Sequence, residues 1–155
     1  MAILRVEPAE PGHIAPLAAG MRAADRAEIW ASHRHTPDAG LAASLAASAL
    51  AWAGLADDEP FCLFGVAPAG SLLGGLGVPW LLGTDALPRH ATGFLRFCPH
   101  YVAAMLAPFG RLANFVDARN RLSIRWLAWL GFTLHPAIPF GPDGLPFHPF
   151  EMRAA

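Results

Sequence analysis

Around residue 117 the spacing of apolar residues changes from that of a strand to that of a helix. This stretch gives the clearest local prediction in the chain. Apolar side chains at 113, 115 and 116 indicate a strand over 112–116. Apolar side chains at 122, 126, 129 and 130 then recur with the spacing of one buried helix face. Asp117 and Asn120 are favourable N-caps, and Gly131 follows the last turn, where the left-handed conformation favours glycine. The pattern predicts a strand, a capped amphipathic helix and a glycine stop.

The rest of the chain predicts a regular succession of elements. Short apolar runs predict strands over 3–6, 49–55, 61–66, 72–82, 133–140 and 145–152. Helical periodicity and capping residues predict helices over 13–21, 23–31, 37–47 and 84–107. We therefore expect an α/β (α+β) fold with a mixed, mostly antiparallel twisted sheet of about six or seven strands, flanked by helices.

Pro79 interrupts the predicted strand over 72–82. A proline removes one donor from the hydrogen-bond ladder of a sheet, so it is confined to bulges and open edges. We expect either a bulge near residues 77–79 or an open edge there.

Length and composition indicate a single domain over residues 1–155. The chain is 54% hydrophobic and 15% charged, which leaves little polar surface and favours a protein partner or a homo-oligomer. Its formal charge is -1 and it contains no lysine, which argues against nucleic-acid binding through phosphates.

Targeting signals and membrane spans are not expected. Cys62 and Cys98 lie in apolar surroundings without metal-site spacing, which indicates reduced core thiols. The N-terminus lacks the charged lead and apolar block of a signal peptide. The uncharged run 39–56 is too weakly apolar to span a membrane, and 60–84 is broken by proline and glycine. We expect a cytoplasmic protein.

The segment 112–132 resembles the C-terminal part of the GNAT (GCN5-related N-acetyltransferase) family. The resemblance rests on Asn120, Ser123 and Gly131-Phe132 after a strand, and the order of elements along the chain agrees with it. It implies a V-shaped slot between the fourth and fifth strands for the pantetheine arm of acetyl-CoA. It also implies cofactor contacts from Asn120, from Arg89, and from the backbone at Leu82, Gly83 and Thr84.

Three features depart from the family pattern. One is Pro79, because the fourth strand of the family normally offers backbone N–H groups to pantetheine. In the loop over 83–93, where the family has a glycine-rich turn that holds pyrophosphate, Arg89 and Gly93 give only a partial match. Leu127 stands where the family often has a tyrosine that acts as general acid. The chain has one tyrosine, Tyr101, and it lies on a different predicted helix.

Other polar residues allow more than one interpretation. Glu28 is a candidate general base on the acceptor side of the slot; the alternative is a surface carboxylate paired with Arg22 or Arg26. His33 and His35 have the spacing of a metal-binding pair, but a solvated pair before a proline accounts for them, so no metal site is expected. Tryptophans at 52, 80, 126 and 129 suit the core, or an aromatic patch at the mouth of the slot.

The segments 24–31, 77–84 and 117–132 together resemble a group of phage and prophage proteins that includes the small internal virion protein of T7-like phages. This resemblance implies a phage- or prophage-encoded GNAT-fold protein. The first hypothesis is an acyl-CoA-dependent N-acetyltransferase with an amine substrate and an atypical cofactor loop. The alternative is a non-catalytic internal virion or assembly protein, virion-associated, that binds another phage structural protein.

Overall fold

The computed structural model describes residues 1–155, with every side chain except that of Leu72. The strands are β1 (Leu4–Pro8), β2 (Leu50–Ala56), β3 (Glu59–Pro68), β4 (Leu76–Gly83), β5 (Arg111–Asp117), β6 (Thr133–Leu134), β7 (Ile138–Phe140) and β8 (Leu145–Arg153). The helices are α1 (Ile14–Ala19), α2 (Ala23–His33), α3 (Pro37–Ala47), α4 (Ala91–Leu95), α5 (Cys98–Phe109) and α6 (Arg121–Leu130), with 3-10 turns η1 (Pro11–His13), η2 (Leu72–Gly74) and η3 (Pro88–His90).

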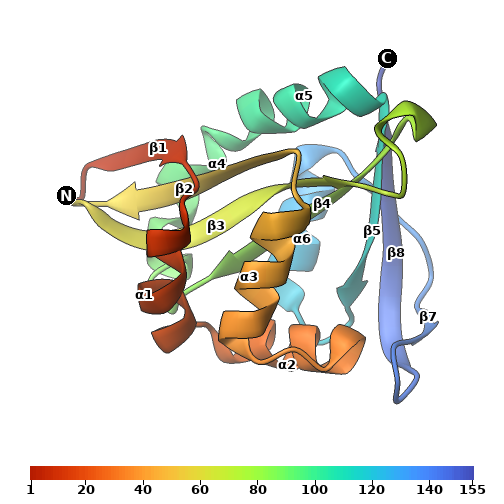
Figure 1. Ribbon diagram of the computed structural model, residues 1–155, viewed down its shortest axis with the longest axis horizontal. Coiled ribbons are helices and arrows are strands. Elements are labelled where there is room, and N and C mark those ends of the chain that lie inside the picture. Colours follow the sequence, from red (N-terminus) through yellow and green to blue (C-terminus); the bar gives the residue numbers. More distant parts are fainter.

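The eight strands form one sheet in the order β1-β2-β3-β4-β5-β8-β6. β7 pairs with the N-terminal part of β8, and β6 pairs with its C-terminal part. β4 and β5 run parallel, and the other neighbouring strands are antiparallel. The mixed, mostly antiparallel sheet flanked by helices is therefore confirmed (Figure 1). The sheet has one or two strands more than expected because the predicted strand over 133–140 is divided into β6 and β7 around Pro136.

Two other boundaries differ from the sequence prediction. The helix expected over 84–107 consists of a turn, η3, α4 and α5, because Pro88 and Pro99 each lie in the first turn of a new segment. Residues 72–74 form η2 rather than the start of β4, and Ser71 caps this turn by accepting a hydrogen bond from the Leu73 N–H.

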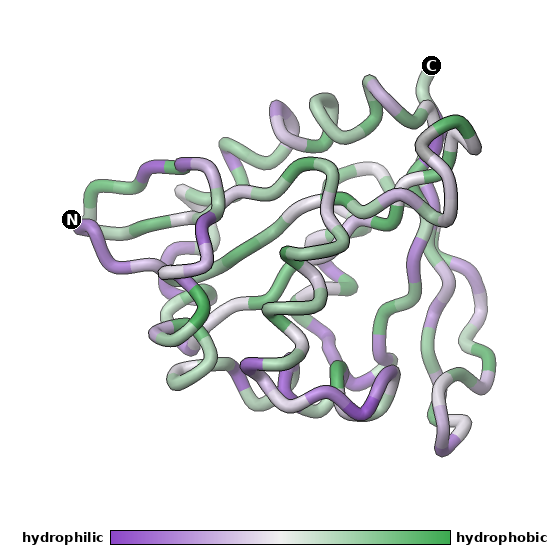
Figure 2. Tube along the Cα trace, in the orientation of Figure 1, coloured by the Kyte–Doolittle hydropathy of each residue, from purple (hydrophilic) through white to green (hydrophobic). Residues whose placement is uncertain are grey.

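Each face of the sheet carries its own core, because successive strand residues point to opposite faces. α1 and α3 cover one face, and this core contains Leu17, Ala18, Met21, Leu41, Ala53, Leu55, Leu63 and Leu82. α4, α5 and α6 cover the other, where the large side chains are Phe61, Phe64, Phe94, Met105, Phe109, Leu112, Trp126 and Phe150. Figure 2 shows hydrophobic residues along the central strands and hydrophilic residues in the turn between α2 and α3.

The capped helix found in the sequence is α6, and Gly131 ends it with a left-handed φ of 99°. Trp126 is buried, as the apolar spacing predicts, but Trp129 is 62% exposed and the prediction at that position is wrong. The helix instead turns Ser123 and Leu127 inward beside Trp126. The side of the helix that faces the cavity therefore follows positions 123, 126, 127 and 130.

β4 and β5 separate soon after they meet. Their parallel pairing in the described chain is Leu76 with Arg111 and Gly77 with Leu112, and beyond these residues the two strands diverge. The register of β4 on β3 is regular throughout, so the bulge near 77–79 is wrong and the open-edge alternative holds. Pro79 is tolerated because its nitrogen faces the side on which β5 has moved away.

Candidate functional site

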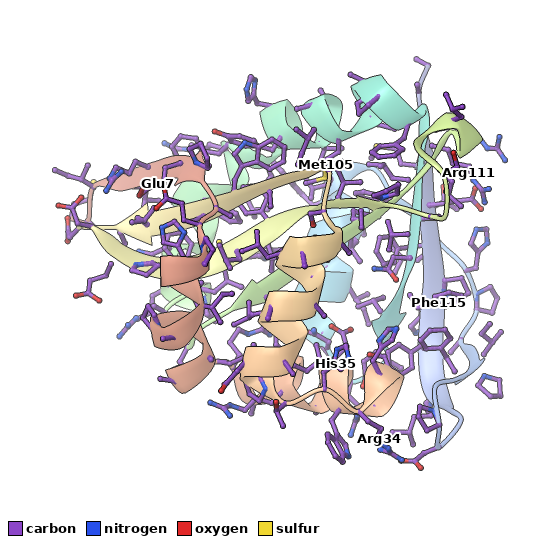
Figure 3. The ribbon with its side chains drawn as sticks, viewed as in Figure 1. Glu7, Arg34, His35, Met105, Arg111 and Phe115 are labelled. Carbon is purple, nitrogen blue, oxygen red and sulfur yellow. The ribbon has the colours of Figure 1, made fainter. Side chains whose placement is uncertain are left out.

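The divergence of β4 and β5 opens a slot, and a cavity of about 230 Å³ passes through it. Asn114 on β5 crosses the narrow end of the slot, where its Nδ2 donates to the Pro79 carbonyl at 2.8 Å. α2 and α3 wall the cavity on one side of the sheet, and α4, α5 and α6 wall it on the other. In Figure 3, Phe115 lies on β5 and Met105 on α5, and both side chains line this cavity. The expected V-shaped slot is present in the fold.

Backbone groups of β4 alternate between β3 and the slot. Thr84 donates its N–H to the Phe61 carbonyl of β3 at 2.9 Å. Because backbone groups of successive antiparallel residues point to opposite sides, Leu82 also faces β3, whereas Leu81 and Gly83 face the slot. The backbone of Leu82 and Thr84 is thus used inside the sheet.

Gly83 faces the slot but is already engaged by α2. Its N–H donates to Asp25 Oδ2 at 2.9 Å, and its carbonyl accepts the Arg22 N–H at 2.9 Å. Leu81, beyond the paired end of the two strands, is therefore the residue of β4 whose backbone groups face the open slot. The cofactor contacts expected of Leu82, Gly83 and Thr84 stay predictions.

The polar wall of the cavity comes mainly from α2. Glu28, Ile29, Ser32 and His33 line it, and their spacing places all four on one side of the helix. Ser44 of α3 faces the same space. This wall brings a carboxylate, two hydroxyls and an imidazole to one end of the slot.

Glu28 is partly buried and borders the cavity. Its Oε1 accepts the Asp117 N–H at 2.6 Å, and its Oε2 accepts Asn120 Nδ2 at 3.3 Å. Burial raises the pKa of Glu28 to about 8, although the Asp117 N–H lowers it in part. The ion pair with Arg22 or Arg26 suggested as an alternative is wrong, because Arg22 pairs with Asp25 and Arg26 donates to the Met21 and Ala18 carbonyls.

Asn120 is a buried connector between α2 and α6. Its side chain does not cap α6; Oδ1 accepts from Arg22 at 3.2 Å, and Nδ2 donates to Asp25 Oδ1 at 3.1 Å as well as to Glu28. Both ends of its amide are hydrogen-bonded within the protein, and 1% of its surface is exposed. The role of Asn120 in cofactor binding, implied by the family resemblance, stays a prediction.

Asp25 and Asp117 complete this buried network. Burial raises the pKa of Asp25, while Arg22 at 3.0 Å opposes the shift. Burial would also raise the pKa of Asp117, but hydrogen bonds from Arg119 outweigh it and hold the pKa below its usual value. The sequence did not predict either aspartate as a site residue, and Asp117 was expected only as a helix N-cap. The spacing of Asp25 and Glu28, three residues apart on a predicted helix, was the available signal.

The loop after β4 leaves no backbone N–H group free for a phosphate between residues 84 and 90. The six N–H groups between residues 84 and 90, a stretch in which Pro88 has none, all donate within the protein: Thr84 to Phe61, Asp85 to Gly20, Ala86 and Leu87 to Thr84, Arg89 to Ala86 and His90 to Leu87. Arg89 is exposed and, with Thr84, borders a separate hollow near β1 rather than the slot. The residues expected to hold a cofactor are thus not brought together at one site.

The opposite wall of the cavity is apolar. Phe94 of α4 contacts Trp126 of α6 with ring centroids 5.9 Å apart, and it packs edge-on against Phe64 of β3 at 5.5 Å. Tyr101 of α5 lines the same wall and packs edge-on against Phe64 at 5.4 Å, so the single tyrosine does reach the cavity. Leu127, in the position of the family tyrosine, also lines it.

The histidine pair has no metal-binding geometry. His33 and His35 stack with ring centroids 5.7 Å apart, and no group of three potential metal ligands occurs among the described residues. Burial lowers the pKa of His33. Both cysteines are free and buried, and burial raises the pKa of Cys98 to about 12.

No protein-family model matches the sequence, and no curated protein matches it either. Within the described part of the chain, every helix is too short or too polar to cross a membrane.

Solved structures do resemble the chain closely in fold. A GCN5-related N-acetyltransferase from Kribbella flavida superimposes with a TM-score of 0.71 at 16% identity, over 97% of this chain and 98% of that one. The aminoglycoside acetyltransferase AAC(6')-Ib, in complex with ribostamycin and coenzyme A, gives 0.69 at 16% identity over 97% and 93%. A protein from Salmonella typhimurium with its cofactor acetyl-CoA gives 0.67 at 14% identity over 97% and 93%. These likenesses establish that the chain has the fold of GNAT acetyltransferases.

Proposed function

We propose that this protein is an N-acyltransferase that transfers an acyl group from acyl-CoA to an amine in the slot between β4 and β5. The observation that carries the proposal is Glu28, a carboxylate whose pKa of about 8 lies near neutrality and whose side chain borders the cavity. A general base works best when its pKa is close to the working pH. Similar folds solved with acetyl-CoA or coenzyme A support the choice of donor.

The slot offers backbone groups to the arm of acyl-CoA, whereas the loop over 84–90 offers none to its diphosphate. The arm of acyl-CoA fits the slot, where Leu81 offers an N–H and a carbonyl for an amide of the arm. The diphosphate finds no backbone cradle at residues 84–90, because these N–H groups are already bonded. Acyl-CoA supplies an activated thioester, and we expect its binding to be weak.

Glu28 accepts the proton that the amine nitrogen loses as its bond to the acyl carbon forms. The Asp117 N–H and Asn120 Nδ2 hold the carboxylate in place, and each oxygen retains a lone pair toward the cavity. A thiol has a pKa near that of cysteine, about 8.5, so the leaving thiolate takes its proton from water without a protein acid. The replacement of the family tyrosine by Leu127 is compatible with this chemistry.

The test is thiol release with acetyl-CoA and a panel of primary amines, together with calorimetry of acetyl-CoA at millimolar concentration. Wild-type protein should release thiol only when an amine is present, and Glu28→Gln should not. The matched control is Glu59→Gln, which removes an exposed carboxylate at the start of β3. Absence of both heat and thiol release with the wild-type protein would refute the proposal.

A second candidate is a non-catalytic protein that uses the GNAT fold to bind a phage structural protein. The closed loop over 84–90 and Leu127 favour it, since both remove features that serve acetyl-CoA in the family. In that case acetyl-CoA should give neither heat nor a thermal shift, and purified virion proteins should bind the chain directly.

A further inference from the structure

We infer that the slot cavity binds a compact amphiphilic amine, with its ammonium against Glu28 and an apolar body of about one aromatic ring against α4, α5 and α6. The inference goes beyond the proposed function and rests on it only in its choice of Glu28 as the polar group. A ligand that fills both ends of the cavity takes the space of the acyl-CoA arm, so it should compete with the donor. Binding itself needs no donor, so it can be measured separately.

The polarity of the cavity is divided between its two ends. Glu28, Ser32, His33 and Ser44 line the end formed by α2 and α3. The other end is lined chiefly by apolar and aromatic side chains, among them Phe64, Phe94, Tyr101, Val102, Met105 and Trp126. A ligand that fills both ends must carry a polar head and an apolar body.

The charges around Glu28 favour a cation as the head. Arg22 and Asp25 form one buried ion pair on the α2 side, and Asp117 pairs with Arg119 on the β5 side. These four charges cancel, and Asn120 between them is neutral. An ionised Glu28 is then the one carboxylate in this network without a cationic partner, and burying such a charge is costly. A bound ammonium supplies the missing partner, whereas a carboxylate ligand would add a second negative charge.

The size of the cavity limits the body. An apolar protein cavity of about 150 Å³ binds benzene. The cavity here is about 230 Å³, and part of it lies at the polar end. It therefore accommodates one ring and a short linker to the amine.

Calorimetry with three small molecules and no donor tests the inference. We expect 2-phenylethylamine at pH 8 to bind at least tenfold more tightly than 2-phenylethanol, which lacks the amine, and than ethanolamine, which lacks the ring. Equal binding of the amine and the alcohol, tight binding of ethanolamine, or no binding of 2-phenylethylamine would each overturn it.

The pH dependence gives a second readout on the same protein. Between pH 6 and pH 8 the affinity for 2-phenylethylamine should rise by up to tenfold per unit, because Glu28 must lose its proton to pair with the ammonium. Other titratable or charged side chains lie near Glu28 or on the cavity wall: Asp25, Asp117, Arg119, His33, Cys98 and Tyr101. Glu28→Gln should abolish both the rise and the preference over the alcohol, and a rise that persists in this variant overturns the assignment to Glu28.

Two variants of α5 locate the body of the ligand. Val102→Phe places a ring inside the cavity and should reduce binding at least tenfold, while Ala103→Phe places the same ring on the exposed side of the helix and should leave binding unchanged. Equal affinities of these two variants contradict the inference, provided that both show the thermal transition of the wild type. Turnover of an amine without any binding of 2-phenylethylamine would refute this inference and keep the proposed function; binding of 2-phenylethylamine without turnover of any amine would do the reverse.

Discussion

The slot and the loop that follows it are neighbours in the fold, yet they differ in what they leave free for a ligand. In the slot, Leu81 and Glu28 still face an open cavity. In the loop over 84–90, each N–H donor is bonded to a protein acceptor, including contacts to Phe61 of β3 and Gly20 after α1. The difference teaches that a chain with the GNAT fold can keep an open slot between β4 and β5 while each backbone N–H of residues 84–90 is bonded within the protein.

The physical basis of this difference is how each region is built. The slot requires that β4 and β5 diverge, and Pro79 and the Asn114 side chain maintain the divergence with few contacts. The loop connects β4 to α4 through Pro88, and its backbone N–H groups form the hydrogen bonds that hold these turns in place. A cradle for phosphates needs donors that point outward, and a loop stabilised by its own N–H groups has none to offer.

The largest effect is expected when the slot loses its base. Glu28→Gln keeps the size of the side chain and one acceptor oxygen for the Asp117 N–H, but its amide nitrogen cannot accept from Asn120 Nδ2 and the side chain cannot accept a proton. We expect kcat for acetyl transfer to an amine to fall by about 10²–10⁴. Steady-state thiol release measures it, and a fall of less than threefold would show that another group is the base.

The next largest effect, on stability, is expected at Gly83, where β4 ends and the loop begins. Asp25→Ala removes the acceptor of the Gly83 N–H and leaves Arg22 buried without its partner, so the free energy of unfolding should fall by about 3–5 kcal/mol. Urea denaturation measures it. The double variant Arg22→Leu with Asp25→Leu should lose less than the single variant, because no unpaired charge is left. A single variant as stable as the wild type contradicts the role of this pair.

The sequence predicted the fold well because period, caps and element order are local properties. The helix from Asn120 to Gly131 and the central strands needed no tertiary information beyond their apolar spacing. The exposure of Trp129 was not predicted. Trp129 and Trp126 both belong to the apolar stripe of this helix, and apolar spacing alone does not say which edge of the stripe faces solvent. Pro136 divided a strand whose aromatic pattern looked continuous.

The site was predicted less well because it depends on which groups are already bonded. Sequence placed Glu28 near the slot but suggested an arginine partner from the neighbouring turns, and long-range bonds to Asp117 and Asn120 replaced it. The direction of the β4 backbone follows from its register on β3, which turns the backbone groups of Leu81, rather than those of Leu82, toward the slot. Such long-range pairings cannot be inferred from spacing along the chain.

A smaller effect is expected at the closed end of the slot. A Cβ on Gly77 would lie 2.7 Å from Val66 Cγ2 and 2.8 Å from Phe109 Cδ2. Gly77→Ala should therefore destabilise the protein by about 1–3 kcal/mol through overpacking. Gly74→Ala is the matched control, because nothing lies within 4 Å of its Cβ position. Equal urea midpoints for the two variants would mean that the strands can part further without cost.

The pH dependence of stability should distinguish the buried carboxylate from its surroundings. Unfolded Glu28 loses its proton near the ordinary glutamate pKa of 4.5, whereas folded Glu28 keeps its proton until about pH 8. Between these values unfolding releases a proton, so the free energy of unfolding falls as pH rises, by up to about 1.4 kcal/mol per unit. Urea denaturation at pH 5, 6, 7 and 8 should show this slope in the wild type relative to Glu28→Gln, a comparison that cancels the contribution of His33. Parallel curves would mean that Glu28 is ionised in the folded protein.

The smallest effect is expected where the loop is closed. If residues 84–90 give the phosphates no backbone donors, S-acetylpantetheine should replace acetyl-CoA with a loss in kcat/KM of less than about tenfold, or about 1.4 kcal/mol. Arg89→Ala should change the KM for acetyl-CoA by a still smaller factor, because this side chain is exposed and lies away from the slot. A preference for acetyl-CoA of a hundredfold or more would show that the loop opens its N–H groups to the diphosphate, and the contrast between slot and loop would then disappear on binding.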